Sequence, residues 1–220
     1  MLPRTAAICV LRRMCRRRRL RMGCVLYDAR LFLNLELEMP TTSPVLQNMS
    51  ALMLRHAELS DASALAELAA RTFRETFAAD NSPEDLQAHL ASAYGEAQQA
   101  AEIADPDVRT VLAYDNAELI GFAQVRRKLF PACVIVEKPV ELHRFYLARA
   151  AQGTGAAVPL MRKAREAAQA LGGEHLWLGV WERNPRAIAF YLKSGFAQVG
   201  SHDFVVGSDT QTDWVFVAPL

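Results

Sequence analysis

The sequence predicts an α/β protein in which one mixed, mostly antiparallel sheet carries helices on both faces. The chain has 220 residues, 51% of them hydrophobic, which suits one globular domain with an appendage. Segments with strand character cluster in the middle of the chain, and segments with helical periodicity are interspersed among them. That order places helices against both faces of a single sheet. Residues 49–220 contain no internal repeat and no linker, so we expect one folded unit.

The first half of this unit combines one strand with helices whose starts are marked by capping residues. Ser60 is the expected N-cap of the first helix, because apolar residues follow it at helical spacing. Ser82 and Pro83 mark a second start, since serine can cap free N–H groups and proline fits the first helical position. The expected elements are a strand over 53–57 and helices over 60–77, 82–93 and 96–104.

The second half alternates strands with two helices. Asp115-Asn116 is a favourable hairpin turn, and Gly172-Gly173 ends a helix. Asn184 is the expected N-cap of a short helix that Gly195 ends. Residues 132–138 are not assigned to either type of element. The expected strands cover 108–114, 118–129, 141–147, 175–181, 196–200 and 213–218, and the expected helices cover 157–171 and 184–194.

Residues 1–48 differ from the rest of the chain in charge. They hold nine Arg and three acidic residues, a net charge of +6, which leaves −5 for residues 49–220 because the whole chain carries +1. Blocks of like charge usually stay solvated, so we expect a disordered basic extension, or sequence upstream of a true start at Met49 or Met53. A transit peptide and a nucleic-acid-binding arm are the alternatives.

Cysteine and histidine usage argues against a disulfide-bonded or metal-binding protein. Only Cys133 lies outside residues 1–48, and neither the four Cys nor the five His show metal-ligand spacing. We therefore expect a protein of the reducing cytoplasm that holds no metal. No apolar run approaches the roughly 20 residues that span a bilayer, so no membrane partner is expected. The oligomeric state is left open, a homodimer included.

A glycine-containing turn is the first functional signal. Residues 152–156 read Gln-Gly-Thr-Gly-Ala and lie between a predicted strand and a predicted helix. The first N–H groups of a helix are unpaired and its dipole favours an anion, so this turn can hold a phosphate. A dinucleotide-binding fingerprint needs a small residue where Val158 stands, and the chain contains no P-loop. By itself the turn is therefore either a binding site for a phosphate-bearing ligand of another kind or an ordinary structural turn.

A second motif, Asn-x-x-Ala-x-x-x-Tyr-x-Lys-x-Gly-Phe, occupies residues 184–196. Together with the glycine turn it resembles the GNAT superfamily of acyl-CoA-dependent N-acyltransferases, over roughly Met53 to the C-terminus. The family's glycine motif begins with Gln or Arg, whereas Ala150 stands in that position here and Arg149 lies one residue away. The resemblance implies the GNAT fold, acetyl-CoA as co-substrate and no metal.

The same resemblance implies two sets of cofactor contacts. The glycine turn would bind the pyrophosphate of CoA through backbone N–H groups. The preceding strand would line the pantetheine arm, and one of its N–H groups would polarise the thioester carbonyl. Asn184 caps its helix and can also reach the pantetheine. The expected contacts are Phe145, Tyr146, Leu147, Gln152, Gly153, Thr154, Gly155, Ala156 and Asn184.

Two residues are expected to carry the chemistry. Tyr191 is the candidate general acid, because a phenol with a pKa near 10 keeps its proton at neutral pH and can give it to the departing thiolate. Glu141 is the preferred base, since the attacking amine must first lose a proton. His143 lies two residues along the same strand and is the alternative base. The amine would attack the thioester directly in a ternary complex. The alternative readings are a packing aromatic for Tyr191 and an exposed charge for Glu141.

A narrower resemblance concerns the acceptor. Residues 72–85 and the run from His202 to Asp213 are similar to bacterial spermidine/spermine N-acetyltransferases. The negative charge of residues 49–220 agrees with a cationic acceptor such as a polyamine. A protein or antibiotic amine is the alternative acceptor. The alternative outside enzymes is a CoA-sensing module with a nucleic-acid-binding arm, although nucleic acid is not an expected partner. The expected acceptor-binding residues are Glu75, Glu84, Asp85 and His143.

Overall fold

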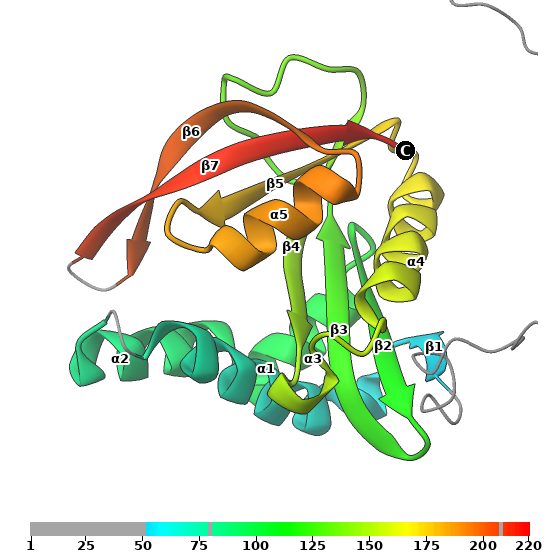
Figure 1. Cartoon of the computed structure of the whole chain (residues 1–220). Coiled ribbons are helices and arrows are strands. Elements are labelled where there is room, and N and C mark those ends of the chain that lie inside the picture. Colours follow the sequence, from blue (N-terminus) through cyan, green and yellow to red (C-terminus); the bar gives the residue numbers. More distant parts are fainter. Residues whose placement is uncertain (1–51, 79–80, 207–208) are drawn as a thin grey trace, which may run out of the picture. The chain divides into compact units, whose positions relative to one another are not determined.

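The computed structural model describes residues 52–78, 81–206 and 209–220, drawn in colour in Figure 1. The expectations for residues 1–48 and for a start at Met49 fall outside the described residues. In the described part, no helix is both long enough and apolar enough to cross a membrane.

The described strands form one seven-stranded mixed sheet, which confirms the predicted fold class. Their order across the sheet is β1-β2-β3-β4-β5-β7-β6. Only the β4–β5 pair is parallel, and the other neighbours run antiparallel. The strands are β1 Leu52–His56, β2 Val108–Asp115, β3 Glu118–Arg126, β4 Pro139–Leu147, β5 His175–Trp181, β6 Ala197–Val206 and β7 Asp209–Pro219.

Helices cover both faces of this sheet (Figure 1). Leu112 and Phe122 point into a core with α1, α2 and the neighbouring residues, while Val111 and Ala123 point into a core with α4. Neighbouring strand residues therefore face opposite cores, as the pleat of a strand requires. The helices are α1 Ala62–Phe77, α2 Pro83–Ala93, α3 Glu96–Ala104, α4 Ala157–Ala170 and α5 Pro185–Lys193.

Two of the three predicted N-caps are confirmed. The Ser82 hydroxyl accepts from the Asp85 amide at 3.1 Å, and Asn184 Oδ1 accepts from the Ala187 amide at 3.1 Å. The third prediction is wrong, because Ser60 lies in a 3₁₀ turn and Asp61 precedes α1. The Asp61 carboxylate accepts from the Glu58 amide and from Arg55, and these bonds form the turn that moves the helix start.

The predicted boundaries are wrong mainly at hairpins. The β2–β3 turn occupies residues 116–117, with Asn116 in the left-handed region at φ 54°, one position later than expected. The strand predicted to reach Leu129 ends at Arg126. The two C-terminal strands are longer than expected because β6 and β7 pair along most of their length, from Ala197 opposite Val217 onward. Cross-strand pairing sustains a strand where apolar alternation is weak.

Candidate active site

The parallel strands β4 and β5 separate at the centre of the sheet. They are paired over only three positions, from Pro139 opposite His175 to Glu141 opposite Trp177. Beyond that point β4 continues to Leu147 and β5 to Trp181, and Figure 1 shows the two strands diverging. Beyond Glu141 and Trp177, the backbone N–H and C=O groups on the facing edges of β4 and β5 do not pair with each other. Such groups need another partner, so an extended ligand with amide groups can pair with them.

The glycine turn lies at the end of β4 and leads into α4. Gly153 and Gly155 have φ values of +81° and +97°, which L side chains rarely adopt. Among the recorded hydrogen bonds of the described residues, none uses the amides of residues 153–157 as a donor. These amides and the N-terminus of α4 therefore offer several free N–H groups and a favourable dipole to one anion.

Gln152 holds the turn in place by joining two elements. Its Nε2 donates to the Leu147 carbonyl at 3.0 Å, and its Oε1 accepts from Arg186 in the first turn of α5. Thr154 Oγ1 donates to the Ala151 carbonyl at 2.8 Å, and the Ala156 side chain is fully buried. The side chains of Gln152 and Thr154 thus shape the turn, and the backbone remains available for binding.

The strand residues expected along the pantetheine arm alternate between the two faces. The Phe145 ring stacks on Phe190 of α5 at 5.4 Å, and Leu147 packs into the same core. Tyr146 points to the other face, where its phenol hydrogen-bonds with Tyr94. Burial raises the pKa of Tyr146 well above its ordinary value. The side chains therefore fix the strand, while its backbone edge faces β5.

Tyr191 is buried on α5, with 8% of its surface exposed. Its ring makes edge-on contacts with the rings of Phe145, Phe190 and Phe196, with centroids 6.5, 5.7 and 5.7 Å apart. Burial raises the pKa of the Tyr191 phenol, so the proton stays on oxygen across the neutral range. The structure records no hydrogen bond from this phenol to any described residue. Tyr191 thus packs as a core aromatic and keeps its phenolic proton at neutral pH.

Glu141 lies at the last paired position of β4, beside His143. Arg126 of β3 donates to both of its carboxylate oxygens, with Nε–Oε2 at 2.5 Å and Nη2–Oε1 at 3.2 Å. His143 Nδ1 is 3.4 Å from Oε1. Burial raises the pKa of Glu141, but hydrogen bonds from His143 and Arg126 outweigh burial, and the net pKa is lowered. Burial lowers the pKa of His143 despite its contact with Glu141, so the imidazole is neutral at pH 7.

A bulge in β4 brings a second buried charged residue, Arg144, to the same face of the sheet as Glu141. The β3–β4 register shifts between Gln124, which faces Arg144, and Val125, which faces Leu142. One extra residue in β4 therefore lets Glu141 and Arg144 face the same side despite their odd spacing. Arg144 pairs with Glu102 of α3.

Sequence reasoning missed Arg126 and the Arg144 pair. Both depend on register between strands, for which no local pattern exists. Alternation in β3 and β4 could have shown which side chains share a face, but not the bulge.

The carboxylates expected to bind the acceptor are not brought together with Glu141. Glu75 lies on α1 and Glu84 in the first turn of α2, and both are exposed. Asp85 Oδ2 accepts from the Ser82 hydroxyl at 3.0 Å. Within the described residues, the structure records no contact between these three carboxylates and Glu141 or His143.

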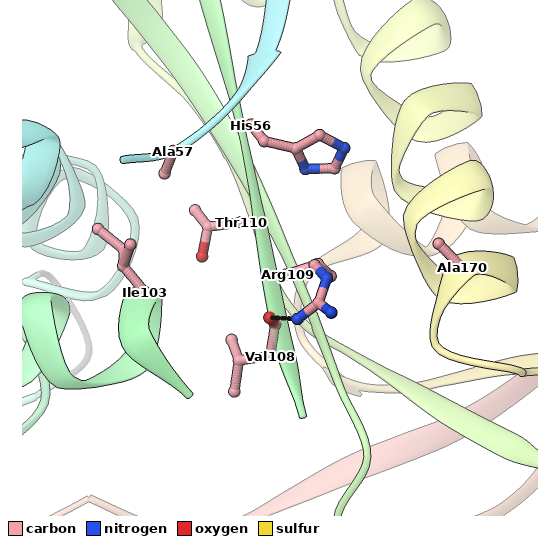
Figure 2. Close-up of a pocket in the computed structure, with 7 residues that line it drawn as sticks. All are labelled: His56, Ala57, Ile103, Val108, Arg109, Thr110 and Ala170. Carbon is pink, nitrogen blue, oxygen red and sulfur yellow. Dashed lines mark hydrogen bonds between the residues drawn. The ribbon is translucent and has the colours of Figure 1, made fainter. Parts of the chain in front are cut away.

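A separate cavity of about 320 Å³ lies elsewhere, where β1 and β2 meet the ends of α3 and α4. Figure 2 shows its lining, with His56 and Ala170 on one side and Ile103 on the other. Arg109 donates to the Val108 carbonyl at 2.7 Å within it. It contains none of the residues expected to bind the cofactor or carry the chemistry.

Comparison with known proteins agrees with this geometry. An uncharacterised N-acetyltransferase of Mycobacterium tuberculosis is 33% identical over 162 residues, covering 74% of this chain and 99% of the relative. The PaiA N-acetyltransferase of Thermoplasma acidophilum, solved with coenzyme A, has a TM-score of 0.62 at 21% identity and covers 77% of this chain and 99% of that one. A mutant spermidine/spermine N-acetyltransferase of Vibrio cholerae has a TM-score of 0.55 at 20% identity, covering 76% and 93%.

The two structural similarities concern the fold alone. The family assignment rests on sequence, because the model of the acetyltransferase (GNAT) family matches residues 63–196, more than half of the chain. The separated parallel strands and the free N–H groups of the glycine turn give that match a structural basis. This chain therefore belongs to the GNAT family of acetyltransferases.

Proposed function

We propose that this acetyltransferase moves the acetyl group of acetyl-CoA to a primary amine of a small cationic molecule, such as a polyamine. The amine attacks the thioester directly in a ternary complex. The observation that supports the proposal is that the candidate bases and the candidate acid lie near the point where β4 and β5 separate. Glu141 and His143 lie on β4, and Tyr191 lies on α5 beside Phe145 of the same strand.

On the donor side, free backbone groups would bind the cofactor. The amides of residues 153–157 would take the pyrophosphate, and the open edge of β4 at residues 145–147 would pair with the pantetheine amides. One N–H of that edge would polarise the thioester carbonyl, an interaction that strengthens as negative charge develops on its oxygen. The Asn184 side-chain oxygen Oδ1 already accepts the capping hydrogen bond from the Ala187 amide. The side-chain NH₂ of Asn184 would therefore be the group that binds the pantetheine.

On the acceptor side, Glu141 and His143 would act as one unit. The Arg126 pair keeps Glu141 ionised and fixed. If His143 Nδ1–H donates to that carboxylate, its Nε2 is an unprotonated base at neutral pH. The amine proton would pass to this pair, directly or through water, and Tyr191 would give a proton to the leaving thiolate.

A cationic acceptor is supported by charge and by sequence. Residues 49–220 carry a net −5, and residues 72–85 and 202–213 resemble polyamine acetyltransferases. Protein N-termini and antibiotic amines are the competing acceptors.

The deciding experiment measures free thiol released from acetyl-CoA with spermidine, spermine, an aminoglycoside and a peptide with a free N-terminus. Turnover confined to the polyamines supports the proposal. Turnover with only the peptide or the aminoglycoside refutes the polyamine acceptor and leaves the acetyltransferase assignment intact.

The Glu141→Gln and His143→Gln variants, assayed over pH 6–9, separate the two candidate bases. The true base shows the larger loss of kcat at every pH.

We also propose that residues 1–48 form an extension outside the acetyltransferase domain of residues 49–220, and that the enzyme works in the cytoplasm. The separate charge of the extension and the lone Cys133 of the domain support these two proposals.

A further inference from the structure

Asp213 of β7 belongs to no ion pair recorded among the described residues, and it lies on the same face of the sheet as Glu141. It stands directly opposite Trp181 of β5 and opposite His202 of β6. Trp181 packs on Phe77 at the end of α1, with ring centroids 5.8 Å apart. Because directly opposed residues point to the same face, Asp213 faces α1 as Trp181 does.

Asn81, which precedes α2, contacts this part of the sheet. Gln211, two residues before Asp213 in β7, donates to Asn81 Oδ1 at 3.2 Å, and Asn81 Nδ2 donates to the Phe77 carbonyl at 2.9 Å. Residues two apart in a strand share a face, so this contact and Asp213 lie on the same side of β7. The carboxylate is therefore bordered by the Phe77–Trp181 ring pair and by the hydrogen bond between Gln211 and Asn81.

Gly179 provides the room for this arrangement. A Cβ atom built there would lie 2.9 Å from His202 Nε2 and 3.1 Å from Asp213 Oδ2, closer than ordinary contact. Both polar groups therefore reach over the bare backbone of β5. They reach toward the side on which β4 and β5 separate. A side chain at position 179 would push them away from that space.

Unlike three other buried or part-buried carboxylates, Asp213 has no recorded arginine or lysine partner in the described part of the chain. Asp61, Glu102 and Glu141 each have an arginine within hydrogen-bond distance. In the described part of the chain, the structure records no hydrogen bond or ion pair for the Asp213 carboxylate. Burial raises the pKa of Asp213 to about 6, and the interaction with His202 lowers it by a smaller amount. A carboxylate withdrawn from water without a partner is costly, so the site is suited to a ligand that brings the positive charge.

We propose that Asp213 binds the distal ammonium group of the acceptor and thereby selects amines with a second positive charge. This inference rests on the proposed acetylation of a small cationic amine. Strand geometry supports the distal role. Asp213 lies about four residues along β5 and about two strands across from Glu141, roughly 16 Å between Cα atoms at about 3.3 Å per residue and 4.8 Å per strand. Asp213 is therefore too far away to share the reacting proton. The aromatic rings of Phe77 and Trp181 would contact the methylene chain between the two amine groups.

The test compares Asp213→Asn with Asp203→Asn in the full chain. Asp203 is an exposed aspartate of the same hairpin, next to His202 on β6 and so on the opposite face. Steady-state rates are measured with spermidine and with heptylamine, a monoamine of similar length. Spermidine binding to the protein–CoA complex is measured separately by calorimetry.

We expect Asp213→Asn to raise the spermidine KM and Kd by roughly tenfold or more, because it removes a partly buried ion pair. The heptylamine KM and the acetyl-CoA affinity should stay unchanged, and Asp203→Asn should behave as the wild type. Equal losses for both amines, or no loss for spermidine, would overturn the inference.

The calorimetric measurement separates this inference from the proposed function. If no amine releases thiol but spermidine binding still depends on Asp213, the proposed reaction fails and the ammonium site stands. If another amine is acetylated while the wild-type complex binds no spermidine, the acetylation stands and the role of Asp213 is refuted.

Discussion

Replacing Tyr191 with phenylalanine separates the chemistry of this site from its packing. The Tyr191 ring packs edge-on against Phe145, Phe190 and Phe196, and all of these contacts survive in the variant. The phenol makes no recorded hydrogen bond to the described residues, so its removal leaves no buried partner unsatisfied. We therefore expect the free energy of unfolding to change by less than about 0.5 kcal/mol.

The rate should respond very differently. If the phenol gives its proton to the leaving thiolate, Tyr191→Phe should lower kcat by about 10²–10⁴-fold, the usual range for a general acid. That range corresponds to about 3–5 kcal/mol in activation free energy. The affinity for acetyl-CoA should hardly change, because the free backbone N–H groups of residues 153–157 and the ring surface remain.

The assay combines thiol release at saturating substrates, calorimetric binding of acetyl-CoA and thermal unfolding. Tyr146→Phe is the matched control, because that phenol hydrogen-bonds with Tyr94. The control should lose about 1 kcal/mol of stability. An unchanged kcat in Tyr191→Phe would show that the residue only packs. A parallel fall of kcat and stability would show that the rate loss comes from a disturbed fold.

Three further predictions concern the cofactor turn, Asp213 and the extension. Gly155→Val should abolish the rise in melting temperature caused by acetyl-CoA, because valine is strained at φ +97° and blocks the backbone; a retained shift would move the pyrophosphate site elsewhere. The pKa of Asp213 is raised from 3.8 to about 6 in the fold, so its contribution to stability is present below pH 4 and is lost as pH rises through 6. The rise sets a limit of about 3 kcal/mol, which partial exposure reduces to about 1 kcal/mol. Asp213→Asn should therefore be more stable than the wild type at pH 7.5 and equal to it near pH 4 in denaturant titrations; a pH-independent difference would contradict this. A chain starting at Met49 should fold and turn over as the full chain does, and insolubility or inactivity would make residues 1–48 structural.

Local chemistry explains the parts of the fold that could be predicted from sequence. Ser82 and Asn184 cap their helices as expected because a cap involves only residues within one turn. The glycine turn was recognisable for the same reason, since positive φ values concern single residues. Ser60 failed as a cap because Arg55, across a bend in the chain, engages Asp61 instead. Strands β6 and β7 were underestimated because their length depends on mutual pairing.

The candidate site divides along the same line. The sequence by itself determined the family, the phosphate-binding turn and the candidate acid and bases, because each is carried by residue types at short spacing. Tertiary structure alone decided that Arg126 holds Glu141 and that a bulge turns Arg144 to the same face. It also decided that Asp213 lies opposite Trp181 and His202, with no arginine or lysine recorded beside it in the described residues. These encounters depend on strand order and register, which are settled by packing of the whole sheet and leave no trace in neighbouring residues.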